Sequence, residues 1–524
     1  MDNFSSTDLS SSPKRGRYRK RSEIWKFFVQ VDNENEISPI KCIICGKQFS
    51  FKSTASNLYR HLNRCHNVEA TSLVKHSTQK NYNPQLPRLL SQNNISLFKV
   101  RSDSMHEFAN KSLKIPFSDT TARSYLREHA KLMREMVFRQ STKKTPFNLC
   151  FDGWTNITGR HIYAFIYRGE SPYTCVFMKQ EHRDGVQSAE WLADVIQKIR
   201  LEMIILNRNL ISCTSDNAAV CVKALTLVNE RKDLARVVHH RCVCHGLSLL
   251  VGEVIKYYKV EKLNKRLVSK IQEIDKKYSP LSYTPTRWGS MLKTMEGLVK
   301  KAECEKVNVS NAYVELMTTI RTITLHIFPL ESDKATLFDE YNELITMTEE
   351  LKRLRTDSSL YALKMYINYY YPYLIDKSGL VVIAGYLNPK TLENVREMYD
   401  VDISIIEKNI IDIAYGWNIP LTLKYLENYL TKTFPFNFNE KLAGKEAWEE
   451  LVIRNDTQET QIMYSFVKTL LTVSPSETCV ERLFSIEKQI HTSIANRMSP
   501  QRVEDTLFLR YNSKLIDILE RGTG

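Results

Sequence analysis

The sequence has no long apolar run, and this absence excludes a membrane-spanning helix. No stretch approaches the roughly 18 apolar residues that a bilayer span requires. The N-terminal segment is polar and then basic, without the apolar region of a secretory signal, so we expect an intracellular protein. No internal repeat of solenoid period is evident, which argues against stacked repeats.

The sequence also lacks the pattern of a disulfide framework. Its 11 cysteines are an odd number spread over 524 residues. In a reducing compartment, clustered cysteines are metal ligands more often than disulfides. Hydrophobic residues make up 43% of the chain, which is enough to bury large cores.

Positive charge is in excess. The formal net charge of +15 points to a polyanionic partner, nucleic acid before membrane. Residues 1–22 form a Ser-rich and then basic arm, which we expect to be disordered on its own. Its cations are Lys14, Arg15, Arg17, Arg19, Lys20 and Arg21. Such an arm is typical of a nuclear-import signal or a DNA-gripping tail, so we expect a nuclear protein.

Residues 23–67 carry a zinc-ligand pattern. Two residues separate Cys42 from Cys45, 15 residues separate Cys45 from His61, and four residues separate His61 from His66. This spacing suits a turn that gives two thiolates and a helix that gives two imidazoles to a tetrahedral zinc ion. Cys65 is a competing fourth ligand, although His66 is preferred. A small core is expected from Trp25, Phe27, Phe28, Phe49 and Phe51.

This unit resembles the BED-type zinc finger, a DNA-binding module. A unit of this size needs its metal to fold. Docking of another protein is the alternative role. Residues 68–100 are polar, rich in Asn and Gln, and predicted to be a linker; residues 101–143 are predicted to be a helical segment, broken at Pro116.

The hydrophobic period changes at about residue 144. Strands are predicted over 147–152, 161–168, 173–179 and 210–216, and helices over 189–206 and 218–230. Three strands, a helix, a strand and a helix are the order expected of a ribonuclease-H-like α/β domain. From about 246 to 430 the pattern is helical, most clearly over 337–355 and 360–375, and helices are also predicted over 464–473 and 480–490.

Three acidic residues are placed to form a two-metal site. Asp152 and Asp216 each end a predicted strand, and Glu481 lies in the last predicted helix. Carboxylates at strand ends can converge on hard divalent cations, and two such cations clamp the attacking and leaving oxygens of a phosphoryl transfer. The alternative for each Asp alone is an Asx turn or a helix cap.

Several segments resemble those of the hAT transposases, and the resemblance covers most of the chain. The first two are Phe151–Thr155, around Asp152, and Thr214–Ala219, around Asp216. The others are Arg241–His245, Thr284–Trp288, Tyr386–Lys390 and Ser474–Ser485. Asn388 stands where the family has an Asp. Glu477 and Glu487 are rivals to Glu481, and the Glu-Arg-x-Phe-Ser context favours Glu481.

The resemblance implies an α+β multidomain protein. A ribonuclease-H-like catalytic core over 144–245 is interrupted by an all-α insertion over 246–460, and 461–524 completes the core and adds a C-terminal dimerisation region. It implies Mg²⁺- or Mn²⁺-dependent excision with hairpins on the flanking DNA, then joining of 3′ ends to target DNA. Asp152, Asp216 and Glu481 would hold the metals, in a homodimer or higher oligomer acting on double-stranded transposon ends and target DNA.

Further residues acquire roles from the same resemblance. Trp288 is suited to stack on an extruded base, and Arg287 to grip a phosphate. Cys242 and His245 are expected to be structural and DNA-positioning, without metal. His239 and His240 are left undecided, and Trp154 is expected to pack in the core.

Two functions of different classes are compatible with the sequence. The first is an active DNA transposase; the alternative is a domesticated BED zinc-finger regulator that binds DNA without catalysis. Retention of all three acids favours the transposase. A ribonuclease H acting on RNA–DNA hybrids is disfavoured by the zinc finger and the long helical insertion.

Overall fold

The structure is a computed structural model. It describes residues 28–30, 40–42, 44–50, 53, 57–58, 61, 119–139, 145–155, 161–169, 178–183, 188–230, 236–281, 289–370, 379–393, 395, 403–490 and 499–516. The chain divides into two compact units, the first made mainly of residues 1–82 and the second of most of the remainder. Within the described parts, no helix combines the length and the apolar character needed to cross a bilayer.

The first unit contains a small antiparallel sheet. Its strands are β1 (Phe28–Gln30), β2 (Ile40–Cys42) and β3 (Gln48–Phe49), in the order β1-β2-β3. Phe28, Ile40 and Leu58 are buried with Cys42 in a minimal core. The Phe49 ring meets the Phe28 ring edge-on at 5.6 Å between centroids. Phe28 and Phe49 thus pack as predicted, while Trp25, Phe27 and Phe51 lie outside the described residues.

The second unit is built on a mixed five-stranded sheet. Its strands are β4 (Thr145–Thr155), β5 (His161–Arg168), β6 (Met178–Arg183), β7 (Arg208–Ser215) and β8 (Val238–Arg241), in the order β6-β5-β4-β7-β8. β5 pairs antiparallel with both β4 and β6, whereas β7 is parallel to β4 and β8 is parallel to β7. Only β5 therefore runs against the other strands of this sheet.

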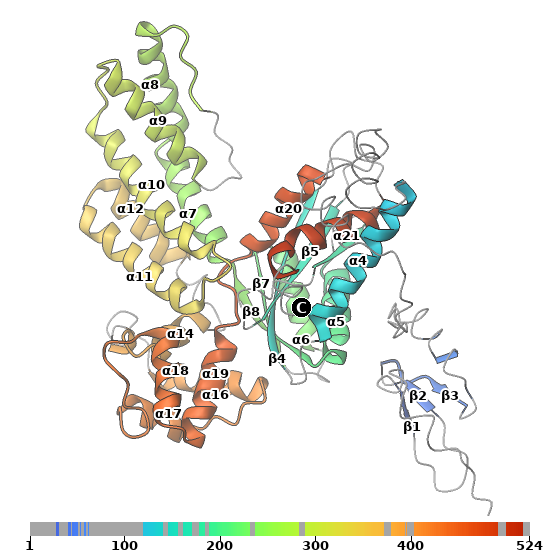
Figure 1. Cartoon of the computed structure of the whole chain (residues 1–524). Helices are drawn as coiled ribbons and strands as arrows, with labels where there is room; N and C mark the ends of the chain where they lie inside the picture. Colours follow the sequence, from blue (N-terminus) through green and yellow to red (C-terminus); the bar gives the residue numbers. More distant parts are fainter. Residues whose placement is uncertain are drawn as a thin grey trace, which may run out of the picture. The chain divides into compact units, whose positions relative to one another are not determined.

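Three helices cover one face of the sheet (Figure 1). They are α4 (Asp119–Arg139), α20 (Thr478–Ile490) and α21 (Pro500–Tyr511). Their apolar side chains pack on Cys150, Ala164 and Ile166 of β4 and β5. On the opposite face, Trp191 of α5 (Ala189–Ile205) packs against Tyr163, with ring centroids 5.4 Å apart. α6 (Ala219–Glu230) links β7 to β8.

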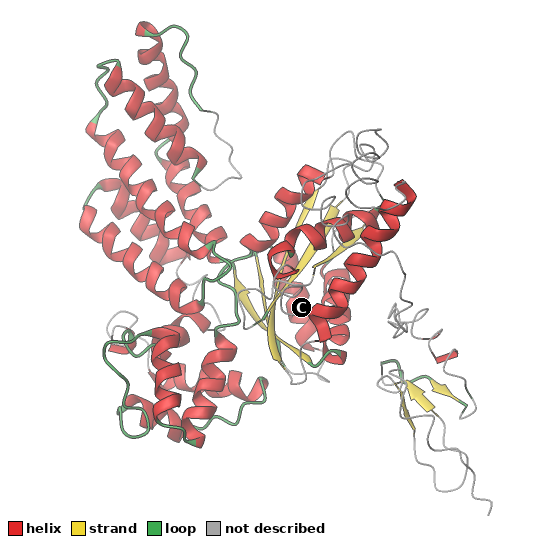
Figure 2. Ribbon diagram, in the orientation of Figure 1, coloured by secondary structure: helices red, strands yellow, loops and turns green. Residues whose placement is uncertain are grey.

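A large helical region separates β8 from α20 (Figure 2). Its helices are α7 (Val243–Tyr257), α8 (Val260–Ile274), α9 (Ser290–Cys304), α10 (Asn311–Leu330), α11 (Leu337–Leu354), α12 (Asp357–Met365), the π-helix η5 (Tyr366–Tyr370), α14 (Leu380–Leu387), α16 (Ile403–Gly416), α17 (Leu423–Leu430), α18 (Gly444–Arg454) and α19 (Gln458–Leu470). They share one core, which is continuous with Ile211, Val238 and Cys242 at the edge of the sheet.

The sequence prediction and the structure differ at several places. Asp152 was predicted to end its strand, but β4 continues to Thr155, so Asp152 lies inside the strand, opposite Ala164 of β5. β8 was not predicted, because Val-His-His-Arg is short and mostly polar. The predicted helix over 464–473 is part of α19, which runs from Gln458 to Leu470 and contributes buried residues to the helical core. The predicted strand over 173–179 is observed as β6 from Met178, and residues 173–177 lie outside the described residues. The overall α+β class is confirmed.

Close packing in the helical region makes Gly385→Ala a destabilising change. A Cβ atom at Gly385 would lie 2.3 Å from Cε2 of Tyr341, and both residues are buried. Overpacking of this kind costs about 1–3 kcal/mol, so thermal or urea unfolding should show a loss of that size. Gly252→Ala is the matched control, because nothing lies within 4 Å of its Cβ position in α7. An equal loss in both variants would contradict the steric explanation.

Candidate functional site

Three zinc-type ligands come together in the first unit. Cys42 ends β2, Cys45 follows in the turn to β3, and His61 lies in a helical segment. Their ligand atoms all lie within 4.8 Å of one another, with Sγ of Cys45 3.4 Å from Nε2 of His61. Two thiolates and an imidazole are the donor set that zinc prefers. His66 and the competing Cys65 lie outside the described residues, as does the basic arm with Lys14, Arg15, Arg17 and Arg19.

The register of the larger sheet places Asp152 and Asp216 side by side. β4 and β7 are parallel, and Cys150 is level with Thr214. Asp152 and Asp216 each follow two residues later. Because side chains alternate along a strand, both acids come on the face of Cys150, which α20 covers. The structure thus brings together the two Asp residues expected from the sequence.

A buried polar network lies directly beneath the two acids. Oδ1 of Asn148 accepts hydrogen bonds from the hydroxyls of Ser212 at 2.8 Å and Thr214 at 3.2 Å. Its amide nitrogen donates to Sγ of Cys150 at 3.2 Å. Asn148, Ser212 and Thr214 have no exposed surface. These bonds join β4 to β7 through side chains and fix the register on which the pairing of Asp152 with Asp216 depends.

The segment Ser474–Glu477 passes over Cys150 of β4 and Thr214 of β7. The Thr214 hydroxyl donates to the Ser474 carbonyl at 2.9 Å, and the Cys150 thiol donates to the Ser476 carbonyl at 3.8 Å. The Glu477 N–H donates to Sγ of Cys242 at 3.5 Å. α20 starts at the next residue, and this attachment brings Glu481, in its first turn, over the strand ends.

The helical region holds this segment from its other side. Arg168 donates to Oγ of Ser474 at 2.6 Å and also to the Ala335 carbonyl. The Ser476 hydroxyl donates to the Leu330 carbonyl at 2.9 Å. Arg482 donates to the Glu331 carbonyl at 2.7 Å and pairs with Asp333. We call residues 330–335, which connect α10 to α11, the α10–α11 turn.

The acids interact electrostatically. Burial raises the pKa of Asp152 to about 7, and the Asp216 charge adds to the rise. Burial also raises the pKa of Glu481 to about 7, with further contributions from Asp152 and Glu331. The pKa of Glu477 is raised well above its ordinary value by burial and by Cys242, Asp152, Asp216 and Glu481. Such mutual repulsion among carboxylates would be relieved by a bound cation.

Glu487, the other rival to Glu481, is placed differently. It is buried, and its pKa is raised to about 7 by burial, but the charge that acts on it is that of Lys488. Glu481 and Glu477 therefore interact electrostatically with Asp152, whereas Asp152 is not among the charges that act on Glu487.

Each of the two Asp side chains also accepts a hydrogen bond from a backbone N–H group close to it in the chain. Oδ1 of Asp216 accepts from the Ala218 N–H at 3.1 Å, which is the turn expected as its alternative role. Oδ1 of Asp152 accepts from the Gly153 N–H at 2.6 Å. Each carboxylate has a second oxygen, so these bonds do not consume its capacity to bind a cation.

Two neighbours of the acids were not identified from the sequence. The pKa of Cys221 is raised by burial and by Asp216, and that of Tyr163 by burial and by several neighbours that include both Asp residues. A Cβ atom at Gly153 would lie 2.9 Å from Cζ of Tyr163, so glycine lets this ring lie against β4. Neither residue has a sequence context that would single it out.

Cys242 has a structural role in this arrangement, and His245 takes part in it through its backbone N–H. Cys242 is fully buried, and its sulfur accepts the His245 N–H at 3.4 Å as the N-cap of α7. The same sulfur receives the Glu477 N–H, so Cys242 joins the start of α7 to the acid-bearing segment. The expected structural role therefore fits, whereas a direct DNA contact by the buried thiol does not. Arg287 and Trp288 lie outside the described residues.

The side chains of the adjacent residues His239 and His240 lie on opposite faces of β8. Nε2 of His240 lies 2.9 Å from Oε2 of Glu340 in the buried interface with α11. Nε2 of His239 lies 3.0 Å from Oγ of Ser215. Burial, Arg241 and His240 lower the pKa of His239 to about 3, which keeps its ring neutral at physiological pH. Both are thus accounted for as structural residues.

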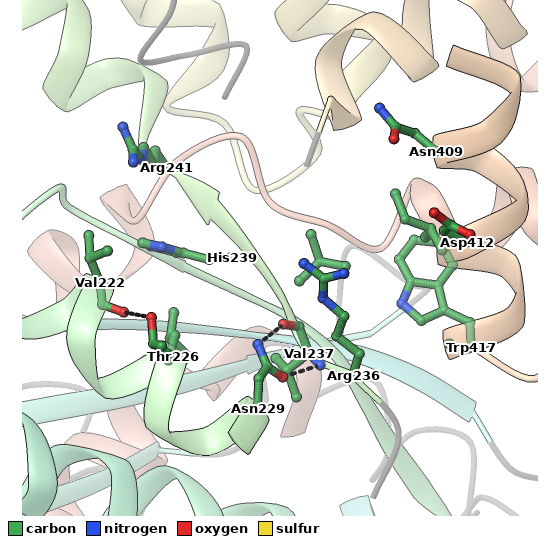
Figure 3. A pocket seen from close by; sticks show the side chains of 14 residues that line it. Val222, Thr226, Asn229, Arg236, Val237, His239, Arg241, Asn409, Asp412 and Trp417 are labelled. Atoms are coloured by element: carbon green, nitrogen blue, oxygen red, sulfur yellow. Dashed lines mark hydrogen bonds between the residues drawn. The ribbon is translucent and has the colours of Figure 1, made fainter. Parts of the chain in front are cut away.

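A cavity of about 300 Å³ lies among α6, β8 and α16 (Figure 3). Its lining combines Arg236, His239 and Arg241 with Asp412 and Trp417. Asn229 closes one side by exchanging two hydrogen bonds of 2.8 Å with the Val237 backbone. His239 and Arg241 pair with Cys213 and Ser215, so by strand alternation they face away from the side of Thr214. The cavity is therefore separate from the acids.

α8 presents a basic surface. Its buried stripe is Val260, Asn264, Leu267 and Ile271. Lys262, Lys265 and Arg266 are exposed on the opposite side of the helix, and none forms an ion pair with another described residue. We call these three side chains the α8 basic face. By contrast, α11 has two basic and five acidic residues.

The motif around Asn388 is a packing element. Oδ1 of Asn388 accepts the N–H groups of Gly444 at 3.0 Å and Lys390 at 3.3 Å. Nε1 of Trp448 donates to the Leu387 carbonyl at 2.7 Å. An amide oxygen accepts these bonds as a carboxylate oxygen would, so this position requires an acceptor rather than a charge.

One family model matches part of the chain. Residues 22–67 match the BED zinc finger. This part of the chain is therefore a BED zinc finger, which indicates DNA binding and a structural zinc, in agreement with the Cys42, Cys45 and His61 cluster. No curated protein matches the chain.

Proposed function

We propose that the protein is a DNA transposase of the hAT type, with a BED zinc finger and a ribonuclease-H-like catalytic core. The observation that carries the proposal is the grouping of Asp152, inside β4, with Asp216, directly after the parallel β7, and with Glu481 in the first turn of α20, which interact electrostatically. The strand order and the single reversed strand, β5, are those of a ribonuclease-H-like sheet, and such a sheet has its acids at this edge. The zinc finger and the net charge of +15 support a DNA substrate.

The acidic site fits hard divalent cations such as Mg²⁺ or Mn²⁺. Its donors are carboxylate oxygens, which these ions prefer. Among the described residues, only the zinc-finger group has three ligand atoms mutually within 4.8 Å, so the carboxylates lie farther apart than in that group. When bound, divalent ions would supply Lewis-acid stabilisation of the attacking and leaving oxygens.

The protein's own residues set up this chemistry. Asp152 and Asp216 are fixed by the register of β4 and β7, and Asn148 holds that register. Glu481 is positioned by α20, whose start is anchored through Ser476 and Glu477. The raised pKa values of Asp152 and Glu481, both about 7, mean that the carboxylates are only partly ionised near neutral pH until a cation favours their charged forms.

An excision assay tests the proposal. The full-length protein, with Mg²⁺, is incubated with DNA that carries the inverted repeats flanking its gene. We expect double-strand breaks at the repeat ends with hairpins on the flanking DNA, followed by joining of the released 3′ ends to a target plasmid. Specific binding to the repeats without cleavage would instead support a domesticated zinc-finger regulator. Cleavage restricted to the RNA strand of a hybrid would support a ribonuclease H.

The α8 basic face is expected to bind the DNA backbone. The triple variant Lys262→Gln, Lys265→Gln and Arg266→Gln removes three phosphate contacts, and each contact contributes about 0.9 to the slope of log K against log salt. The slope, measured by fluorescence anisotropy over a salt series, should become shallower by about 3. The matched control replaces Lys352, Arg353 and Arg355, at the end of the acidic helix α11, with Gln, and its slope should stay as in wild type. An unchanged slope in the α8 variant would exclude this face from the DNA interface.

A further inference from the structure

The acidic site contains a fourth carboxyl group, that of Glu477. Glu477 is the last residue of the segment that crosses β4 and β7. Its neighbours Ser474 and Ser476 are bound by Thr214 and Cys150, each two residues before one of the Asp residues. Its own N–H is bound by Cys242 at the start of α7. Three hydrogen bonds therefore hold the segment at Glu477, from Thr214, Cys150 and Cys242. Along the chain, Glu477 lies closer to these bonds than Glu481 does.

Glu477 and Glu481 are on the same side of α20. The Glu477 carbonyl accepts the Val480 N–H at 2.7 Å and the Glu481 N–H at 3.4 Å, which is the bonding of a first helical turn. Residues four apart lie one above the other on a helix. Glu477 thus lies one helical turn before Glu481, nearer to the sheet.

The side chain of Glu477 is buried without a complete set of partners. Only 2% of the residue is exposed, and its Oε2 has no hydrogen-bond partner within the described part of the chain. A buried acceptor without a partner costs about 1–3 kcal/mol, so a fold retains one where another interaction compensates. Asp152, Asp216 and Glu481 are near enough to interact with it electrostatically, and a cation is a partner that would satisfy such a group of carboxylates.

We propose that Glu477 is a ligand of the divalent-metal site, so that four carboxylates rather than three hold the ions. This inference rests on the proposed function, because it assigns a further ligand to the same site. Glu477 would add a buried carboxylate to the half-buried Asp152, Asp216 and Glu481, and the four side chains together would hold the ions through oxygen donors.

Direct metal binding tests the inference without any DNA cleavage. Mn²⁺ binding to the full-length protein, with zinc in the finger, is followed by electron paramagnetic resonance of the free ion. Glu477→Gln keeps the size of the side chain and is expected to weaken Mn²⁺ binding about 10- to 100-fold, as loss of a ligand or its direct support does. Glu477→Asp, which keeps the charge but shortens its reach, should also weaken binding. Glu487→Gln, a buried acid of the same helix, should bind Mn²⁺ as wild type does.

The outcomes separate this inference from the proposed function. Circular dichroism and thermal melting first establish that each variant is folded. If Asp152→Asn lowers Mn²⁺ affinity but Glu477→Gln and Glu477→Asp do not, Glu477 is not a ligand and the three-acid site stands. If the folded wild-type protein binds no Mn²⁺ at the acids, both this inference and the proposed metal-dependent function fail. Equal weakening by Glu487→Gln would show a general effect of buried charge and would overturn the assignment.

Discussion

Asp152→Asn is expected to abolish metal-dependent DNA cleavage while leaving DNA binding intact. The substitution keeps the shape of the side chain and an oxygen that can accept the Gly153 N–H, so β4 should be undisturbed. It removes a negative charge from the site at which the cations would be held. Because each metal contributes several kcal/mol to transition-state stabilisation, cleavage should fall by at least about 10³-fold.

The measurement is a gel-based cleavage assay beside an anisotropy measurement of DNA affinity. Asp194→Asn, on the exposed side of α5, is the control for a lost surface charge. If the Asp152→Asn variant cleaves DNA at the wild-type rate, Asp152 is not part of the reacting centre. A parallel loss of DNA affinity would mean that the substitution disturbs the fold or a phosphate contact instead.

The second large effect is expected from Cys42→Ser. Cys42 is both a zinc-type ligand and a member of the minimal core of the finger, where the buried residues are few. Without its metal a unit of this size does not hold its fold. The variant should lose the bound zinc and bind transposon ends at least about 10-fold more weakly, because the finger supplies part of the DNA interface.

Zinc content by atomic absorption and end binding by gel shift measure this effect. Cys304→Ser is the matched control, because Cys304 is an exposed thiol at the end of α9. The second compact unit should melt as in wild type, since its core does not depend on the zinc cluster. Loss of zinc without loss of end binding would indicate that the finger docks a protein rather than DNA.

The sequence predicted the central elements well because their local patterns are strong. The run from His161 to Arg168 is rich in β-branched and aromatic residues, and it forms β5 over the same residues. The prediction that Trp154 packs in the core is confirmed by its stacking on Phe484, with ring centroids 5.0 Å apart. Asp152 and Asp216 could be paired from sequence only on the assumption that their strands are neighbours, and the parallel register of β4 and β7 provides this.

Other features depend on tertiary contacts that no local pattern records. β8 is a strand because its backbone pairs with β7, although Val-His-His-Arg has little apolar character. The Glu-Arg-x-Phe-Ser context favoured Glu481 in the sequence, and only the course of Ser474–Glu477 across the sheet shows that Glu477 also lies near the Asp residues. The contact of the Cys242 sulfur with the Glu477 N–H likewise joins residues more than 200 positions apart, which no local pattern predicts.

The attachment of the α10–α11 turn to the segment that carries the acids has a mechanical consequence. Arg168, Ser476 and Arg482 tie this turn to both ends of the segment through carbonyl oxygens and Asp333. Arg168 itself lies in β5, and His240 of β8 contacts Glu340 of α11, so the helical region is also joined to the sheet directly. A displacement of the α10–α11 turn would therefore be transmitted to Glu477 and Glu481 through the segment that carries them, and to Asp152 and Asp216 through the sheet.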